Sequence, residues 1–159
     1  MLLYHGSDVV VDHPVLMARR RALDFGPGFY LTSSRAQAER WARVVRLRRR
    51  SGQSVLNTYD FDVSRAAHLR TLRFESAGAD WLEFVCSNRR CGGAYAGYDL
   101  VVGPVADDST LPVIDGYMDG VYTAEEAVRR LLPQNLTDQY SLLTEDAISC
   151  LTFVKGEEV

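Results

Sequence analysis

A mostly apolar run with three valines is the strongest constraint on the fold. It spans residues 98–105, Tyr-Asp-Leu-Val-Val-Gly-Pro-Val, and contains a Gly-Pro pair close to its end. A short continuous apolar run bounded by turn residues is typical of a fully buried strand. The sequence therefore predicts that residues 98–105 form a central strand of a sheet.

Strands and helices are both predicted along the rest of the chain. Apolar alternation and short aromatic runs predict strands over 1–4, 55–63, 69–72, 139–143 and 147–154, and a glycine-punctuated turn leading into a short strand over 25–31. Apolar residues at spacings of three and four predict helices over 35–50, 79–88 and 123–132. Gly52 is expected to stop the first helix, and residues 107–119 are expected to form a loop. The mixture predicts an α+β fold.

Length and composition predict a single globular domain over residues 1–159. A chain of 159 residues with 47% hydrophobic and 25% charged residues can bury a sizeable core. The sequence contains no internal repeat, low-complexity tract or linker. The net charge of −3 gives no bulk attraction to nucleic acid, although Arg19–Arg21 and Arg40–Arg50 are basic patches suited to phosphates or a partner.

The cysteines and the N-terminus predict a cytoplasmic protein. Three cysteines, an odd number, argue against a disulfide framework, and the C-x4-C spacing of Cys86 and Cys91 lacks the second ligand pair of a zinc site. We therefore expect reduced thiols and no bound metal. The N-terminus has neither a basic region nor an apolar stretch, so no signal peptide is predicted. No apolar run approaches the roughly 18 residues of a membrane span.

Three short motifs indicate a function when they are taken in order. They are Tyr4-His5-Gly6-Ser7, the run from Phe25 to Thr32 (Phe-Gly-Pro-Gly-Phe-Tyr-Leu-Thr), and Asp138-Gln139-Tyr140-Ser141. Each is weak alone. Together they resemble the NAD-binding core of the ADP-ribosyltransferases, the fold of the diphtheria-toxin-like and poly-ADP-ribose polymerase enzymes. The resemblance implies a split β-sheet core and NAD as a substrate.

The first two motifs carry most of the expected NAD contacts. The resemblance implies that His5 contacts the adenosine ribose and that the backbone of Gly6 pairs with the nicotinamide carboxamide, with Ser7 following in the same motif. In the second motif, Phe29 and Tyr30 are expected to bind NAD, with Tyr30 packing on the nicotinamide. His5 and Tyr30 are therefore expected to be catalytic.

The remaining positions depart from the pattern of those enzymes. Trp41 stands where a second aromatic residue, usually Tyr, closes the nicotinamide pocket, and Ala38 stands where a Ser often holds the carboxamide. Gln139 stands where the third catalytic residue is usually Glu. An amide can bond a ribose hydroxyl but supplies no negative charge to an oxocarbenium-like transition state. Thr137, two residues before it, lacks the acid typical of arginine-directed transferases.

A closer resemblance is to the family of small bacterial proteins called DUF3990. It rests on Leu23–Thr32, Trp81–Arg89, Tyr98–Asp108 and Gln139–Phe153, spread over most of the chain. It implies an ADP-ribosylating toxin with a cognate antitoxin and a macromolecular target, a protein being favoured.

Two alternatives stay open. One is a degenerate NAD- or ADP-ribose-binding module. The other is transfer to nucleic acid, or a phosphotransferase-like reaction on RNA ends. The related RNA enzymes use a second histidine, whereas His13 and His68 fall outside the motifs.

Overall fold

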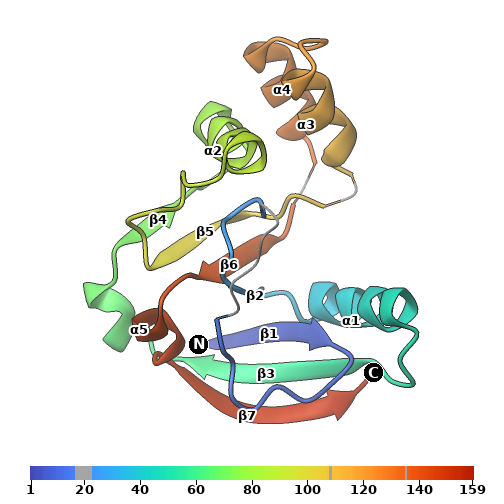
Figure 1. Cartoon of the computed structure of the whole chain (residues 1–159), viewed down its shortest axis with the longest axis vertical. Coiled ribbons are helices and arrows are strands. Elements are labelled where there is room, and N and C mark those ends of the chain that lie inside the picture. The colour runs from blue at the N-terminus through green and yellow to red at the C-terminus, as the bar shows by residue number, and fades with distance from the viewer. Residues whose placement is uncertain (17–22, 108, 135) are drawn as a thin grey trace.

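Two β-sheets and several helices make up the protein (Figure 1). The computed structural model describes residues 1–16, 23–107, 109–134 and 136–159, so Arg19–Arg21 and Asp108 lie outside the described residues. Sheet A has the antiparallel order β1-β3-β7, formed by Leu2–Ser7, Val55–Phe61 and Leu151–Glu158. Sheet B has the order β2-β6-β5-β4, formed by Phe29–Leu31, Asp138–Leu142, Leu100–Pro104 and Thr71–Arg73. The predicted α+β class is confirmed.

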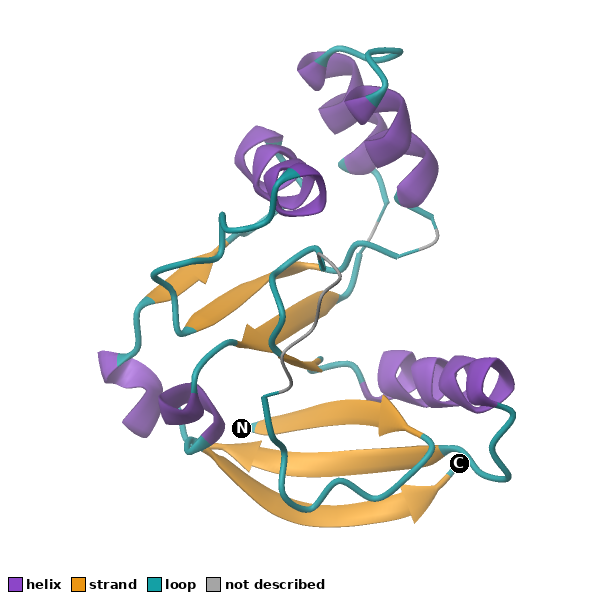
Figure 2. Ribbon diagram, viewed as in Figure 1, coloured by secondary structure: helices purple, strands orange, loops and turns teal. Residues whose placement is uncertain are grey.

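The helices cover the sheets unequally. They are α1 (Arg35–Arg49), α2 (Ala79–Arg90), α3 (Leu111–Met118), α4 (Ala124–Leu131) and α5 (Glu145–Ile148), with a 3-10 helix η1 (Arg65–His68). Helix α1 lies along sheet A, whereas α2, α3 and α4 gather beyond sheet B (Figure 2). No helix in the described part of the chain is long and apolar enough to cross a membrane.

Strand β5 is an internal strand, as its apolar run predicts. It pairs with β6 on one side and β4 on the other. Val102 lies in the core between the two sheets, together with Leu3 and Tyr59 from sheet A. Val101 points to the opposite face, into the core beneath α2 that contains the fully buried Trp81. Because both faces of β5 are covered, its sequence is apolar without alternation.

Capping residues fix the predicted helix starts, while one predicted stop is wrong. The Ser34 and Thr123 hydroxyls accept hydrogen bonds from the N–H groups of Gln37 and Glu126, at 3.3 and 3.2 Å. Helix α1 is terminated by its C-cap residue Arg50, whose φ is left-handed at 54°, and not by Gly52 as expected. The N–H of Arg50 still bonds back into the last turn, which compensates for the strain of a non-glycine residue there.

Two segments differ from the prediction: in the first a proline is tolerated in the opening turn of a helix, and in the second a hydroxyl caps a short helix. Residues 107–119, expected to be a loop, contain α3, in which Pro112 sits in the first turn where it costs no hydrogen bond. Val113 and Ile114 of this helix are buried. The strand expected from Ala147 begins only at Leu151, because the Thr144 hydroxyl accepts a hydrogen bond from Ala147 and starts α5.

Candidate functional site

The two sheets meet where β1 runs beside the end of β2. The N–H of Tyr4 donates to the carbonyl of Thr32 at 2.9 Å, and the N–H of Thr32 donates back at 3.0 Å. One residue on, Nδ1 of His5 donates to the carbonyl oxygen of Tyr30 at 2.7 Å. A neutral imidazole with its proton on Nδ1 has Nε2 as its acceptor atom. We call this junction of β1 and β2 the seam.

Gly6 presents its backbone at the open edge of β1. Backbone groups alternate sides along a strand. The N–H and C=O of Tyr4 are hydrogen-bonded to Thr32 on the side of β1 away from β3. The N–H and C=O of Gly6, two residues further, therefore point to that same side. Within the described chain, no hydrogen bond to these groups from outside the β1–β3 ladder is found. Gly6 therefore offers one donor and one acceptor beside His5.

Close packing by α1 explains why position 6 is a glycine. A Cβ there would lie 2.1 Å from the carbonyl oxygen of Ala38 and 2.7 Å from the N of Ala42. Both alanines are buried against β1. The neighbouring Ser7, at the end of β1, is buried, and its hydroxyl accepts a hydrogen bond from Val9 at 3.4 Å. Ser7 thus shapes the exit from β1.

Phe29 and Tyr30 point to opposite faces of β2. The Phe29 ring packs on His5 with centroids 4.5 Å apart and meets Tyr59 edge-on at 5.8 Å. Phe29 therefore holds the imidazole from the core between the sheets. The Tyr30 hydroxyl donates to the carbonyl of Gly26 at 2.6 Å and accepts from the N–H of Phe25 at 3.1 Å. These bonds fix the Tyr30 ring by its far end.

Helix α2 anchors the turn that holds Tyr30. Asn88, almost fully buried, donates to the carbonyl of Asp24 at 2.9 Å, and Arg89 Nε lies 2.5 Å from the Asp24 carboxylate. A Cβ at Gly26, where φ is 85°, would lie 2.5 Å from the Tyr95 ring. Through these contacts Asn88 and Arg89 hold the turn in place.

Gln139 lies on the same face of sheet B as Tyr30. Tyr30 is in register with Ser141, so Gln139 is its diagonal neighbour, about 7–8 Å away by sheet geometry. Gln139 Nε2 is buried and has no acceptor among the described residues. A buried donor of this kind needs a partner. The amide is therefore suited to a ligand oxygen.

Asp138 fastens the start of β6 to the junction of β2 and α1. Its carboxylate accepts from the Thr32 hydroxyl at 3.0 Å and from the N–H and hydroxyl of Ser33 at 2.8 and 2.5 Å. Gln37 extends the network by accepting from the hydroxyls of Thr32 and Thr137. Since its oxygens are occupied, Asp138 acts as the anchor that sets the register of Gln139.

Trp41 lies on the surface of α1. It is 48% exposed, and the Arg48 guanidinium stands 5.1 Å from its ring centroid. Arg35 and Trp41 lie three residues before and after Ala38, about 60° to either side of it on a helix. Arg35 reaches Glu157 on β7. Trp41 therefore flanks the opposite side, toward the open edge of β1.

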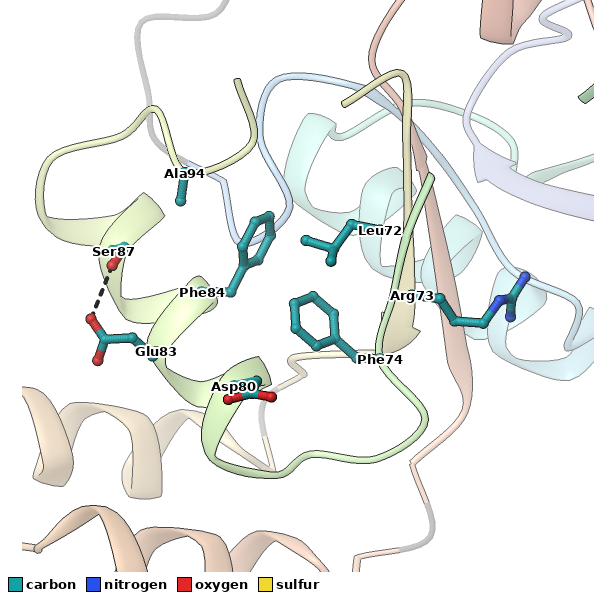
Figure 3. A pocket seen from close by; sticks show the side chains of 8 residues that line it. All are labelled: Leu72, Arg73, Phe74, Asp80, Glu83, Phe84, Ser87 and Ala94. Atoms are coloured by element: carbon teal, nitrogen blue, oxygen red, sulfur yellow. Dashed lines mark hydrogen bonds between the residues drawn. The ribbon is translucent and has the colours of Figure 1, made fainter. Parts of the chain in front are cut away.

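A pocket of about 490 Å³ lies between β4 and α2, away from the seam (Figure 3). Leu72, Phe74 and Phe84 converge on it, and Ser87 bonds Glu83 at its rim. None of the site residues predicted from the sequence lines it. Elsewhere in the described residues, no group of three or more His, Cys, Asp and Glu could hold a metal ion. The seam therefore remains the candidate site.

Comparison with known proteins identifies the family. A family model described as "Protein of unknown function (DUF3990)" matches residues 1–153. The chain belongs to the DUF3990 family. Searches of curated proteins and of solved structures gave no match. Membership therefore confirms the predicted family without assigning an activity.

The structure brings only some of the predicted residues into contact. His5 touches both Phe29 and Tyr30, and Gly6 adjoins them on β1. Gln139 is the diagonal neighbour of Tyr30 on β6, and Trp41 lies exposed on α1. The sequence did not reveal the anchoring roles of Asp24, which directly precedes the second motif, and of Asp138, which opens the third.

Proposed function

We propose that this DUF3990 protein is an NAD-dependent ADP-ribosyltransferase that modifies a macromolecule. The observation that carries the proposal is the seam, where the Nδ1 bond of His5 to Tyr30 sits beside the outward-facing backbone of Gly6. The order of the three motifs along the chain adds to it. The family resemblance extends the proposal to a toxin with a cognate antitoxin and favours a protein target.

Gly6 is suited to the carboxamide of nicotinamide. A primary carboxamide has one carbonyl acceptor and an NH₂ donor, and the N–H and C=O of one strand residue can pair with both. Ala38 supplies no hydroxyl for a further bond. The carboxamide would therefore be held by backbone alone on this side.

The rings and the imidazole would hold the rest of NAD. Nε2 of His5, the acceptor in its neutral form, can accept a hydrogen bond from a ribose hydroxyl. Tyr30 and Trp41 would bracket the nicotinamide, which requires Arg48 to leave the face of Trp41 that it now covers. Phe29 keeps the imidazole in place.

The reaction breaks the bond between ribose C1′ and the nicotinamide nitrogen. The bonding electron pair moves to the pyridinium nitrogen, which loses its positive charge as nicotinamide leaves. A nucleophile on the acceptor then bonds C1′ and gives up its proton. Gln139 Nε2 would donate to the nicotinamide-ribose hydroxyl oxygen. Because an amide carries no charge, much of the rate would come from orientation of NAD.

We also propose that the protein acts in the cytoplasm. All three cysteines are free thiols, and Cys86 and Cys150 are buried. Burial raises the pKa of both thiols, so they resist oxidation. Unpaired cysteines are typical of a reducing compartment.

Release of nicotinamide from NAD by the purified chain tests the proposed site. His5→Ala should reduce the rate at least about 100-fold, since it removes a group that contacts both NAD and the Tyr30 backbone. His13→Ala is the matched control, because the His13 side chain is 90% exposed and lies outside the seam. Equal rates for the two variants would overturn the assignment.

A second candidate is an NAD- or ADP-ribose-binding module with weakened catalysis. The observation that favours it is the uncharged Gln139 at the third motif. Measuring both nicotinamide release and NAD affinity of Gln139→Glu distinguishes an active transferase from a binding module. A large gain in turnover would indicate lost catalysis in the natural chain, whereas a loss would indicate an active site adapted to the amide.

A further inference from the structure

Positive charge is concentrated on a single helix. Helix α1 together with Arg50 has one acid, Glu39, and seven arginines: Arg35, Arg40, Arg43, Arg46, Arg48, Arg49 and Arg50. Its formal charge is +6, and the whole chain carries −3, so the remaining residues carry −9. Such segregation creates a local positive field on an acidic protein.

Most of these arginines have no carboxylate partner in the described part of the chain. Arg35 pairs with Glu39 and Glu157, and Arg49 pairs with Asp8. The other five are exposed, and none has a carboxylate partner in the described part of the chain. Those in the last turn complement the helix dipole, but Arg40 and Arg43 lie mid-helix, where that effect has faded.

The unpaired arginines form a row on the outer side of α1. Arg40, Arg43 and Leu47 follow at spacings of three and four, which places them on one face of α1, and Arg50 follows as the C-cap residue of the helix. The row is about 15 Å long, since ten residues rise about 1.5 Å each. Ala38, on the opposite side, packs on Gly6, so this face points away from sheet A. We call it the arginine face.

We propose that the arginine face binds the phosphate backbone of single-stranded nucleic acid. The planar guanidinium donates two parallel hydrogen bonds to a phosphate and is always charged. Protein interfaces, by contrast, have apolar cores depleted of charge. Within the row, Leu47 is the one exposed apolar side chain, at 70% exposure. The chemistry of this face therefore matches a polyanion better than a protein.

The rest of the molecule selects a single strand over a duplex. A stiff duplex extends well beyond a 15 Å row and would meet surface that is acidic on balance. A flexible strand can follow the helix for a few phosphates and turn away. The face borders the seam at Trp41 and Arg48, yet its binding requires no NAD. The proposal thus goes beyond the transferase activity, and nucleic-acid binding can be tested independently of it.

Fluorescence anisotropy of a labelled single-stranded oligonucleotide, about 12 nucleotides long, tests the proposal. With about three phosphates neutralised, one for each arginine of the face, the logarithm of the affinity should fall with log salt at a slope of about −2. Arg40→Gln/Arg43→Gln should weaken binding about tenfold and reduce the slope by about 1.4. Arg65→Gln/Arg129→Gln, with the same change in charge on exposed residues outside α1, should bind as the natural chain does.

Three results would overturn the proposal. The α1 variant could bind as tightly as its charge-matched control. A duplex of equal length could bind more tightly than the single strand. A polyglutamate peptide of equal charge could displace the oligonucleotide, which would identify an acidic protein segment as the partner. Circular dichroism of both variants checks that α1 is still folded.

Discussion

Replacing Gly6 by alanine tests how closely α1 sits on β1. The new Cβ would lie 2.1 Å from the carbonyl oxygen of Ala38, within the backbone of a helix that cannot swing aside like a flexible side chain. Real Cβ contacts rarely fall below 3.0 Å, so α1 must retreat by about 0.9 Å. That shift loosens Ala38 and Ala42, which are 2% and 0% exposed.

The expected cost follows from overpacking in a closely packed core. Inserted methyl groups cost about 1–3 kcal/mol, and a backbone clash belongs at the upper end, about 3 kcal/mol. For a chain of this length each kcal/mol lowers the melting temperature by about 2–4 °C, so Gly6→Ala should melt about 6–12 °C lower.

The assay is thermal unfolding followed by far-ultraviolet circular dichroism, with urea unfolding to give the free energy. Gly52→Ala is the matched control, because a Cβ there meets nothing within 4 Å. It should be neutral or slightly stabilising, since alanine narrows the unfolded ensemble. A difference of about 1 °C corresponds to at most about 0.5 kcal/mol. If the two variants melted within that difference of each other, the close approach of α1 to Gly6 would be refuted.

Three further perturbations test single contacts. The Arg70 hydrogen bond lowers the pKa of Asp99 from 3.8 to about 2. The ionised pair therefore stabilises the fold fully above about pH 4, and this stabilisation is lost as the pH falls toward 2. When the free energy of unfolding is measured against pH, Asp99→Asn should remove about 1 kcal/mol of the pH-dependent stabilisation, a value reduced because Arg70 is exposed to solvent. An unchanged pH profile would refute the role of the pair. Thr123→Ala removes a helix cap and should cost about 1 kcal/mol in urea. Gly28→Ala places a Cβ 2.3 Å from the Ser141 hydroxyl and should lower the melting temperature more than Thr123→Ala does.

Elements set by local rules could be predicted from the sequence. Strand β5 and the starts of α1 and α4 depend on an apolar run and on capping hydroxyls within a few residues. Helix α3 could not, because Pro112 and Gly116 read as helix breakers. Gly116 in fact packs under Tyr122, whose ring lies 2.5 Å from where a Cβ would be. That contact exists only in the folded chain.

The candidate site was predictable in its residues but not in its geometry. The motifs name His5 and Tyr30, while their hydrogen bond depends on β1 meeting β2. The exposure of Trp41 could not be predicted, because helical spacing alone does not say which side of a helix faces the sheet. The bond from Arg89 to Asp24 spans 65 positions, so no local pattern could reveal it.

Transfer of label from NAD to a macromolecule tests the proposed transferase activity most directly. The purified chain is incubated with NAD labelled in its adenylate half and a bacterial lysate, beside His5→Ala and His13→Ala, and the products are digested with protease or with nuclease. The account predicts label on a discrete macromolecule with the natural chain and with His13→Ala, and none with His5→Ala. Protease-sensitive label would identify a protein acceptor, and nuclease-sensitive label a nucleic acid. Intact NAD and an unlabelled lysate with the natural chain would contradict the assignment of this protein as a transferase.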